Sequence, residues 1–299
     1  MPEVLIIANP TSGSLAAPKL ATRVAELLRA RGASVELKVT AARGDAQKFA
    51  AAAASAGVVC VAGCGGDGTL QEIATALEGS TTALGILPGG RCNDFAQALG
   101  LSKNTSAEIL AAMLAARKTR AVDLGAMGSR RFLTVATLGF DSAVSRFVEN
   151  RRLWVKGTLA YLYGVARILP GYEFPHVRLS GDFGVKEGRM LLAATGNAGS
   201  YGGAMKIAPE AKIDDGLFDV CVVEKTARLS VLRILPQVLS GGHTTHPAVS
   251  IVRTRTLEIE TPGGAQFICA DGETLGQTPC RFEVRPGALR VVCGEVTNV

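Results

Sequence analysis

The stretch that decides the fold runs from Val58 to Glu78 and reads VVCVAGCGGDGTLQEIATALE. Its apolar beginning, Val58–Ala62, predicts a buried strand, and Leu70–Glu78 has the residue pattern of a helix. Between them lies the glycine-rich loop Gly63–Thr69. Glycines permit positive φ, so successive backbone N–H groups can converge on one anion at the start of a helix. The stretch predicts a strand–loop–helix unit with a phosphate-binding loop, and a tight turn without a ligand is the alternative.

The same alternation of strand and helix patterns fills the first half of the chain. Strands are expected at Val4–Asn9, Ser34–Thr40 and Ala83–Leu87, in addition to Val58–Ala62. Helices are expected at Ala16–Arg31, Asp45–Ala56, Leu70–Glu78, Asp94–Leu99 and Ser106–Arg117. Such alternation predicts an α/β domain in which helices cover a parallel sheet.

The second half changes character and is rich in strand-like runs. The runs are Arg131–Thr137, Val177–Ser180, Met190–Thr195, Leu217–Glu224, Val249–Glu260, Gln266–Ala270, Arg281–Arg285 and Leu289–Cys293. Two helices, at Lys156–Leu169 and Arg228–Leu239, interrupt them. This pattern predicts a β-rich antiparallel sandwich or barrel. We therefore divide the chain into an α/β domain at 1–125 and a β-rich domain at 126–287, with 288–299 as a strand that could return to the first domain.

Composition excludes several classes of protein. The 299 residues are 47% hydrophobic and 19% charged, which excludes intrinsic disorder as the main state. A net charge of +6 favours contact with phosphates or acidic lipid headgroups, but scattered basic residues and 5% aromatics do not predict nucleic-acid binding. Seven cysteines without a C-x-x-C pair predict free thiols in a reducing cytoplasm. No apolar run is long enough to span a bilayer and the start lacks an export signal, so a cytoplasmic location is expected.

Two further loops and one residue, like the glycine loop, lie at the carboxyl ends of expected strands. Asn9–Gly13 follows the first expected strand, Thr40 ends the second, and Pro88–Asp94 follows the fourth. Because ligands bind at the carboxyl ends of parallel strands, these segments predict one shared nucleotide site. Gly63, Gly65 and Gly68 also fit the dinucleotide pattern G-x-G-x-x-G, but residues 85–92 lack the acidic partner that this pattern requires, so an oxidoreductase is not supported.

At this point the sequence resembles the diacylglycerol kinase catalytic-domain superfamily, specifically its soluble bacterial lipid kinases. Matching motifs occur in the family's order along nearly the whole chain. They are Asn9–Gly13, Gly65–Thr69 with Glu72, Asn93–Ala96, Tyr201–Met205, Ile207–Pro209, Asp214–Leu217 and Asp271–Glu273. Such an ordered set is far more specific than any single motif.

The resemblance implies an α/β nucleotide domain like that of phosphofructokinase and NAD kinase, a β-rich second domain, and transfer of the γ-phosphoryl group of ATP to a lipid hydroxyl such as that of diacylglycerol. It also implies ATP and Mg²⁺ as cofactors. The expected ATP contacts are Asn9, Pro10, Thr11, Ser12, Gly13, Thr40, Gly65, Gly66, Asp67, Gly68, Thr69, Leu70, Gln71, Glu72, Arg91, Asn93 and Asp94. Lys212, Asp215 and Leu217 match a second, structural magnesium site, for which a plain turn at Asp214–Gly216 is the alternative.

Three carboxylates are the expected catalytic residues. Glu273 matches the family's general base, Asp271 would orient metal or water, and Asp67 would hold Mg²⁺ beside the phosphates. A surface turn is the alternative for Asp271–Glu273. One departure from the family stands out, because Arg91 occupies a position that is usually threonine. An arginine there either binds a phosphate or obstructs the site.

The expected substrate is a lipid met at the inner face of the membrane, with the chain bound peripherally. Arg146–Tyr172 combines basic and aromatic residues, as in segments that contact acidic membranes, although a helix packed on the sheet is the alternative. Two other functions stay open: a kinase for a soluble substrate, related to NAD kinase, and a lipid-binding or regulatory pseudokinase. The sequence does not identify the lipid, and it leaves the oligomeric state, a homodimer included, undecided.

Overall fold

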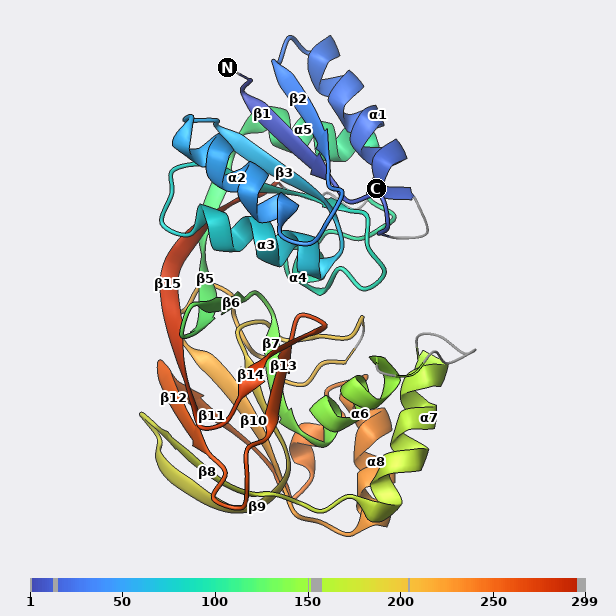
Figure 1. Cartoon of the computed structure of the whole chain (residues 1–299), viewed down its shortest axis with the longest axis vertical. Coiled ribbons are helices and arrows are strands. Elements are labelled where there is room, and N and C mark those ends of the chain that lie inside the picture. Colours follow the sequence, from blue (N-terminus) through green and yellow to red (C-terminus); the bar gives the residue numbers. More distant parts are fainter. Residues whose placement is uncertain (1, 13–15, 150, 152–157, 204, 295–299) are drawn as a thin grey trace. The chain divides into compact units, whose positions relative to one another are not determined.

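A computed structural model describes residues 2–12, 16–149, 151, 158–203 and 205–294 (Figure 1). The chain forms two compact units. The first comprises residues up to Leu124, the segment Ile213–Gly216 and the residues from Arg285 onward. The second comprises Gly125–Lys212 and Leu217–Val284. The first unit therefore includes a four-residue segment from within the range that the sequence assigns to the β-rich domain.

The first unit is built on a parallel sheet in the order β4-β3-β1-β2. The strands are β1 (Val4–Ala8), β2 (Val35–Val39), β3 (Cys60–Gly65) and β4 (Ala83–Pro88). Residues of β1, β3 and β4 are buried throughout, because helices cover both faces of the sheet. The register pairs Ala8 with Cys64 and Gly65 with Pro88, so the strands end level with one another.

Helices on both faces of this sheet follow from right-handed crossovers between its parallel strands. They are α1 (Ala16–Ala30), α2 (Asp45–Ser55), α3 (Asp67–Leu77), α4 (Asp94–Ala98) and α5 (Ala107–Ala116). Helix α1 packs with α5, and α2 packs with α3 on the opposite face (Figure 1). The alternation predicted from the sequence is therefore confirmed.

The second unit is built from antiparallel strand pairs, as the sequence predicts. Its strands are β6 (Arg130–Phe132), β7 (Val135–Gly139), β8 (His176–Gly181), β9 (Gly184–Gly196), β10 (Phe218–Glu224), β11 (Val249–Thr254), β12 (Thr256–Glu260), β13 (Phe267–Ala270) and β14 (Glu273–Gln277). The first half of β9 pairs with β8, and the second half pairs with β7 and β10. One long strand therefore belongs to both halves of the sandwich.

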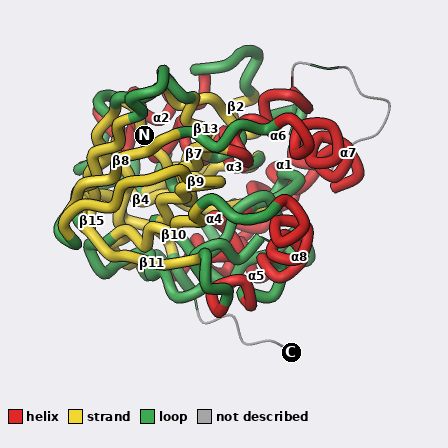
Figure 2. The backbone as a smooth tube through the Cα atoms, turned by 90° about the horizontal axis from the view of Figure 1, so that it is seen from below, coloured by secondary structure: helices red, strands yellow, loops and turns green. Residues whose placement is uncertain are grey.

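Three helices cover one face of this unit, visible at the side of the strands in Figure 2. They are α6 (Phe140–Glu149), α7 (Thr158–Ile168) and α8 (Arg228–Val238), with short 3₁₀ turns at Leu169–Gly171 and Gly242–Thr245. Alternate residues of β10 point to two cores. Val220 and Val222 join the core between the strands, whereas Cys221 and Val223 pack under the helices. Burial on both faces explains why this strand is continuously apolar.

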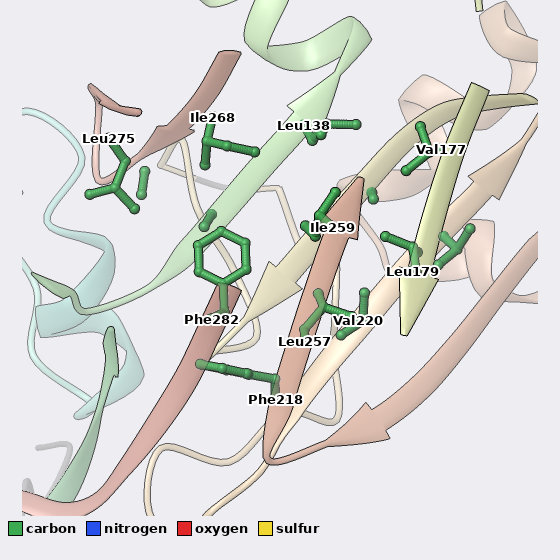
Figure 3. Packing of buried hydrophobic residues seen from close by; sticks show 14 of the residues in the cluster. Leu138, Val177, Leu179, Phe218, Val220, Leu257, Ile259, Ile268, Leu275 and Phe282 are labelled. Carbon is green, nitrogen blue, oxygen red and sulfur yellow. The ribbon is translucent and has the colours of Figure 1, made fainter. Parts of the chain in front are cut away.

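The core between the strands contains three buried phenylalanines, of which Phe218 and Phe282 are labelled in Figure 3. Phe132 stacks on Phe218 at a centroid distance of 5.7 Å and meets Phe282 edge-on at 5.6 Å. Because β6, β10 and the C-terminal strand each contribute one ring, this contact joins segments far apart in sequence. It holds the sandwich together through apolar burial.

Several elements differ from the sequence expectations. Arg281–Arg285 and Leu289–Cys293 are one strand, β15 (Cys280–Val292), which continues through Pro286 and Gly287. The single run expected at Val249–Glu260 is two strands, β11 and β12, with different partners. The sequence reading missed β5 (Thr119–Met127), β14 and the helix α6. The cysteines are all free as predicted, and four of the seven are buried.

Candidate functional site

The glycine loop lies where β3 passes into α3 in the first unit. Gly65 ends the strand, Gly66 is the N-cap residue in extended conformation, and no side chain caps the helix. A Cβ on Gly65 would lie 2.6 Å from Thr69 Oγ1, so only glycine fits there. The first turn of α3 therefore presents its backbone amides at an N-terminus that carries partial positive charge.

A second glycine loop packs directly against the first. A Cβ on Gly90 would collide with the Cα of Gly66, and it would also lie 2.9 Å from the Gly66 nitrogen. By contrast, a Cβ on Gly66 would lie 3.6 Å from the Cα of Gly90, which is an ordinary contact. Gly90 is thus glycine because two loop backbones meet there.

Asn93 closes the second loop. It is buried and adopts a left-handed conformation with φ of 54°. Its Oδ1 accepts a hydrogen bond from Gly90 N at 2.9 Å, and its Nδ2 donates to Gly90 O at 2.9 Å. These two hydrogen bonds stabilise the conformation of the second loop. Asp94 begins α4 immediately after Asn93.

Asp67 links the two loops. Its Oδ1 accepts a hydrogen bond from the backbone nitrogen of Phe95 at 3.2 Å, so the first residue of α3 satisfies the start of α4. Burial raises the pKa of the Asp67 carboxyl, although hydrogen bonds from Phe95, Asn93 and neighbouring amides act in the opposite direction. The carboxylate expected to hold Mg²⁺ thus has backbone partners inside the protein.

Asn9 connects the loop after β1 to the same helix. Its Nδ2 donates to Thr69 Oγ1 at 3.1 Å, and its Oδ1 accepts hydrogen bonds from Thr11 N at 3.0 Å and Thr11 Oγ1 at 2.8 Å. Pro10 and Ser12 complete the turn, and Gly13 lies outside the described residues. Buried Thr40 donates its N–H to Ala8 O at 3.0 Å, which places it beside the end of β1.

The remaining residues expected to contact ATP, three in α3 and one in the second loop, differ in exposure. Leu70 is fully buried in the core, so only its backbone can meet a ligand. Gln71 Nε2 donates to Thr75 Oγ1 at 3.5 Å. Glu72 Oε1 accepts a hydrogen bond from Gly44 N at 2.8 Å, which ties the segment before α2 to α3. Arg91 is exposed on the loop between Gly90 and Asn93.

Asp271 and Glu273 lie in the second unit at the β13–β14 hairpin. Asp271 and Gly272 both have positive φ, at 49° and 83°, as a two-residue turn of type I′ requires. Ala270 pairs with Glu273, which is the first residue of β14 and is half-buried. The backbone at Asp271–Glu273 is therefore a turn, as the alternative interpretation predicts. A catalytic role depends on the side chains of Asp271 and Glu273.

The Asp271 carboxylate is anchored to the strand segment before β7. Oδ2 accepts a hydrogen bond from Leu133 N at 2.7 Å, and Oδ1 accepts from Thr134 N at 3.0 Å and Thr134 Oγ1 at 2.5 Å. On the other side of this segment, Asn197 Nδ2 donates to Leu133 O at 2.9 Å. Asp271 therefore fixes the turn that carries Glu273, an arrangement typical of a positioning residue.

The predicted metal segment 212–217 is held by a residue that the sequence reading missed. Asp123 is buried, and its two carboxylate oxygens accept hydrogen bonds from Gly216 N and Gly287 N, both at 2.7 Å. Its own N–H donates to Ile213 O at 2.7 Å. Lys212 and Asp215 are exposed and Leu217 is half-buried. A lone aspartate in an apolar strand, VDL, was the available signal for Asp123.

A second missed group is the buried Asp141 in α6. Tyr161 Oη donates to its Oδ1 at 2.7 Å, and Thr137 Oγ1 donates to its Oδ2 at 3.0 Å. Burial raises the pKa of the Asp141 carboxyl despite hydrogen bonds from Tyr161, Tyr201 and Thr137. The group joins β7, α6 and α7 inside the second unit.

Among the described residues, groups of three or more His, Cys, Asp or Glu side chains suited to a metal ion do not occur. Within the same residues, every helix is too short or too polar to cross a membrane.

Comparison with known proteins gives matches over both halves of the chain. Residues 3–127 match the diacylglycerol kinase catalytic domain, and residues 134–293 match the YegS C-terminal NAD kinase beta sandwich-like domain. A protein named diacylglycerol kinase from Mycobacterium tuberculosis (strain ATCC 25618 / H37Rv) is 34% identical over 298 residues, covering 97% of this chain and 94% of that protein.

A protein from Pseudomonas aeruginosa (strain UCBPP-PA14), named "Probable lipid kinase YegS-like", is 35% identical over 266 residues, covering 88% of this chain and 86% of that protein. Among solved structures, a crystal structure of a diacylglycerol kinase from Bacillus anthracis str. Sterne has a TM-score of 0.79 at 26% identity. It covers 98% of this chain and 97% of that chain. The matches therefore extend over both units rather than over one motif.

Proposed function

Since the chain belongs to the diacylglycerol kinase catalytic-domain family, we propose that it transfers the γ-phosphoryl group of ATP to the hydroxyl of a lipid such as diacylglycerol. Family membership makes it a kinase that acts on a lipid alcohol. The observation that carries the proposal is the uncapped N-terminus of α3 behind a glycine loop that a second loop braces.

The proposed nucleotide site follows from the loops at the carboxyl edge of the parallel sheet. Backbone amides around Gly66 and Gly68 would hold phosphate oxygens, because the helix N-terminus supplies donors and partial positive charge and the N-cap residue Gly66 has no side chain. Asn9 and Asn93 fix the loops on either side through their own hydrogen bonds. Phosphoryl transfer depends mainly on positioning and charge neutralisation, and this arrangement supports both.

Two places in the described chain offer oxygen donors suited to Mg²⁺, the segment 212–217 and Asp67. Mg²⁺ keeps several waters and takes one or two protein carboxylates together with phosphates. At 212–217 the exposed carboxylate of Asp215 and nearby carbonyls are donors of this type, and Asp123 holds the segment in place. Asp67 is the carboxylate nearest to the glycine loop. When bound, Mg²⁺ would neutralise phosphate charge during transfer.

Glu273 is the proposed general base. A carboxylate must come within hydrogen-bond reach of the attacking hydroxyl to take its proton. Its position at the start of β14 is set by the two-residue turn and by the Asp271 anchor to Leu133 and Thr134. Asp271 therefore acts through Glu273 in this proposal, because both of its carboxylate oxygens accept hydrogen bonds from the segment at Leu133 and Thr134.

The acceptor is proposed to be met at a membrane surface, because a diacylglycerol-like lipid resides in a bilayer. The test is incubation of the purified chain with ATP, Mg²⁺ and a panel of hydroxyl lipids plus NAD, followed by mass spectrometry of the products. Phosphorylation of diacylglycerol supports the proposal, and the Glu273→Gln variant gives the background. Phosphorylation of NAD alone would favour the soluble-substrate alternative, and ATP binding without any product would favour a pseudokinase.

A further inference from the structure

Exposed leucines are concentrated on one part of the molecule. Among the described residues, all five leucines that count as exposed lie on α7, on α8 or at the C-terminal cap of α8. They are Leu159, Leu162, Leu229, Leu232 and Leu239. Single exposed apolar residues are common on protein surfaces, but a concentration on two helices indicates a surface that a partner covers.

Helix α7 is apolar on two sides. Ala160 and Val165 are buried against the unit, whereas Leu159 and Leu162 are 65% and 54% exposed and Tyr163 is 42% exposed. The exposed three are spaced i, i+3 and i+4, so they share one side of the helix. A surface helix normally carries polar residues on its outer side, and α7 does not follow that pattern there.

Helix α8 repeats the arrangement. Val231, Ile234 and Val238 are buried, while Leu229, Leu232 and Leu239 are 73%, 50% and 56% exposed. The spacing i, i+3 and i+10 again places the exposed leucines on one side. The exposed leucines therefore lie on the side of α8 opposite to its buried residues.

The two helices lie on the same side of the second unit. Their buried residues pack in one cluster with β7, β9 and β10, so both outer sides point away from the same sheet. Arg228 at the start of α8 joins it to the 3₁₀ turn after α7, since its Nε donates to Leu169 O at 3.0 Å and its Nη2 donates to Tyr172 O at 3.2 Å. Figures 1 and 2 show α7 and α8 flanking the strands on this side. We call this surface the α7–α8 face.

The charges on this face are positive. Arg167 and Arg233 are exposed, and neither helix contains an acidic residue, although exposed Glu173 follows just after α7. We propose that the α7–α8 face docks on bilayers that contain anionic phospholipid, with the leucines inserted at the level of the headgroups and the arginines paired with lipid phosphates. Exposed apolar residues beside cations are what such a surface requires.

A second copy of this chain suits the face less well. Self-association through it would bring Arg167 and Arg233 of both copies together without acidic partners on the helices. Helix α7 lies within Arg146–Tyr172, the segment considered for membrane contact from the sequence, whereas Arg146 and Arg151 of the same segment contact aromatic rings. Arg146 stacks over the Phe267 ring at 3.1 Å and Arg151 over the Phe147 ring at 4.4 Å, while residues 152–157 lie outside the described part.

The inference rests on the proposed function for its biological sense, but its test does not require turnover. Vesicles of phosphatidylcholine with and without 30% phosphatidylglycerol are sedimented with the wild type, with Leu229→Ser/Leu232→Ser and with Leu159→Ser/Leu162→Ser. Each leucine lost should lower the partition coefficient roughly tenfold. Val185→Ser is the matched control, because Val185 is 55% exposed in the same unit on the β8–β9 hairpin, and it should change partitioning less than about twofold.

The charge component has its own variants. Arg167→Gln and Arg233→Gln should each weaken binding to the anionic vesicles roughly fivefold and leave binding to phosphatidylcholine alone nearly unchanged. All variants should unfold at the temperature of the wild type, because the changed side chains point outward. Phosphorylation of a water-soluble short-chain diacylglycerol should also remain at the wild-type rate.

Three results would overturn the inference. The first is that the wild type does not bind anionic vesicles. The second is that both leucine variants bind these vesicles as strongly as the wild type does. The third is that the wild type is a dimer, that the leucine variants are monomers, and that vesicle binding persists in these variants. A chain that binds vesicles through this face but phosphorylates no lipid would support the surface and refute the proposed function. The two failures are thus separable.

Discussion

The close approach of the two glycine loops gives the sharpest prediction for the first unit. In Gly90→Ala the new methyl would collide with the Gly66 backbone and lie 2.8 Å from Asn93 Oδ1. The backbones cannot yield without separating by about 1 Å, and the Asn93 bridge to Gly90 is disturbed as well. Overpacking of this kind costs about 1–3 kcal/mol of folding free energy.

The matched variant is Gly66→Ala, in the opposite loop of the same contact. Its methyl would lie 3.6 Å from Gly90, and Gly66 has an ordinary φ of −93°. The folding free energy of this variant should therefore stay within about 0.5 kcal/mol of the wild type. The two variants carry the same chemical change and differ only in the space available.

Thermal unfolding and calorimetric titration of ATP measure the two consequences. With about 2–4 °C lost per kcal/mol, Gly90→Ala should melt roughly 2–12 °C below the wild type. It should also bind ATP more weakly, because the second loop no longer braces the first. Equal melting temperatures for Gly90→Ala, Gly66→Ala and the wild type would refute the packing of the loops. A destabilised Gly90→Ala with unchanged ATP affinity would refute the role of that packing in nucleotide binding.

Four further predictions concern single side chains. Glu273→Gln should lower kcat by about 10²–10⁴ with little change in the KM for lipid, and a loss confined to KM would make Glu273 a binding residue. Asp271→Asn puts an amide where two backbone N–H groups donate, so it should lower kcat and destabilise the chain by about 1–3 kcal/mol; unchanged melting would contradict the anchor. Because burial raises the pKa of Asp141 in the folded state, folding stability is lost as pH rises through that pKa, so the wild type should lose melting temperature relative to Asp141→Asn as pH rises above about 4, the usual pKa of an unfolded Asp; parallel curves would contradict this. Arg91→Ala should weaken ATP binding by about 1–3 kcal/mol in calorimetric titration, whereas tighter binding by Arg91→Ala and Arg91→Thr would mean that Arg91 obstructs the site.

The first unit was predictable because its signals are local. Each strand of the parallel sheet is a short apolar run followed by a turn and a helix, and the glycine loop lies within one such unit. The shared edge of the loops then follows from topology alone, as the register of Ala8 with Cys64 and Gly65 with Pro88 shows. Periodicity and turn residues were sufficient for this part.

The second unit was less predictable because its contacts join distant residues. Asp271 bonds to Leu133 and Thr134 across more than 130 positions, and Asp123 bonds to Gly287 across 164. No local pattern reports such partners. The turn formed by Asp271 and Gly272 was visible in the sequence, but its anchoring was not.

Strand β15 illustrates how tertiary partners override a local signal. Pro286 and Gly287 are a strong turn pattern, so the sequence predicted two strands. In the structure the strand continues because its two halves pair with different units, β12 on one side and β4 on the other, and the Gly287 N–H is taken by Asp123. The sequence analysis included α7 in the segment considered for membrane contact, but it missed the outer leucines of α8, since a pattern of apolar residues does not say which side is covered.

The measurement that tests the central claim most directly is transfer of label from ATP to diacylglycerol by the purified chain. With γ-³²P-labelled ATP, Mg²⁺ and diacylglycerol in anionic vesicles, we predict labelled phosphatidic acid, one ADP per phosphorylated lipid, and near-background transfer by Glu273→Gln. Absence of labelled lipid from a folded chain that binds ATP, or equal transfer by Glu273→Gln, would contradict the account.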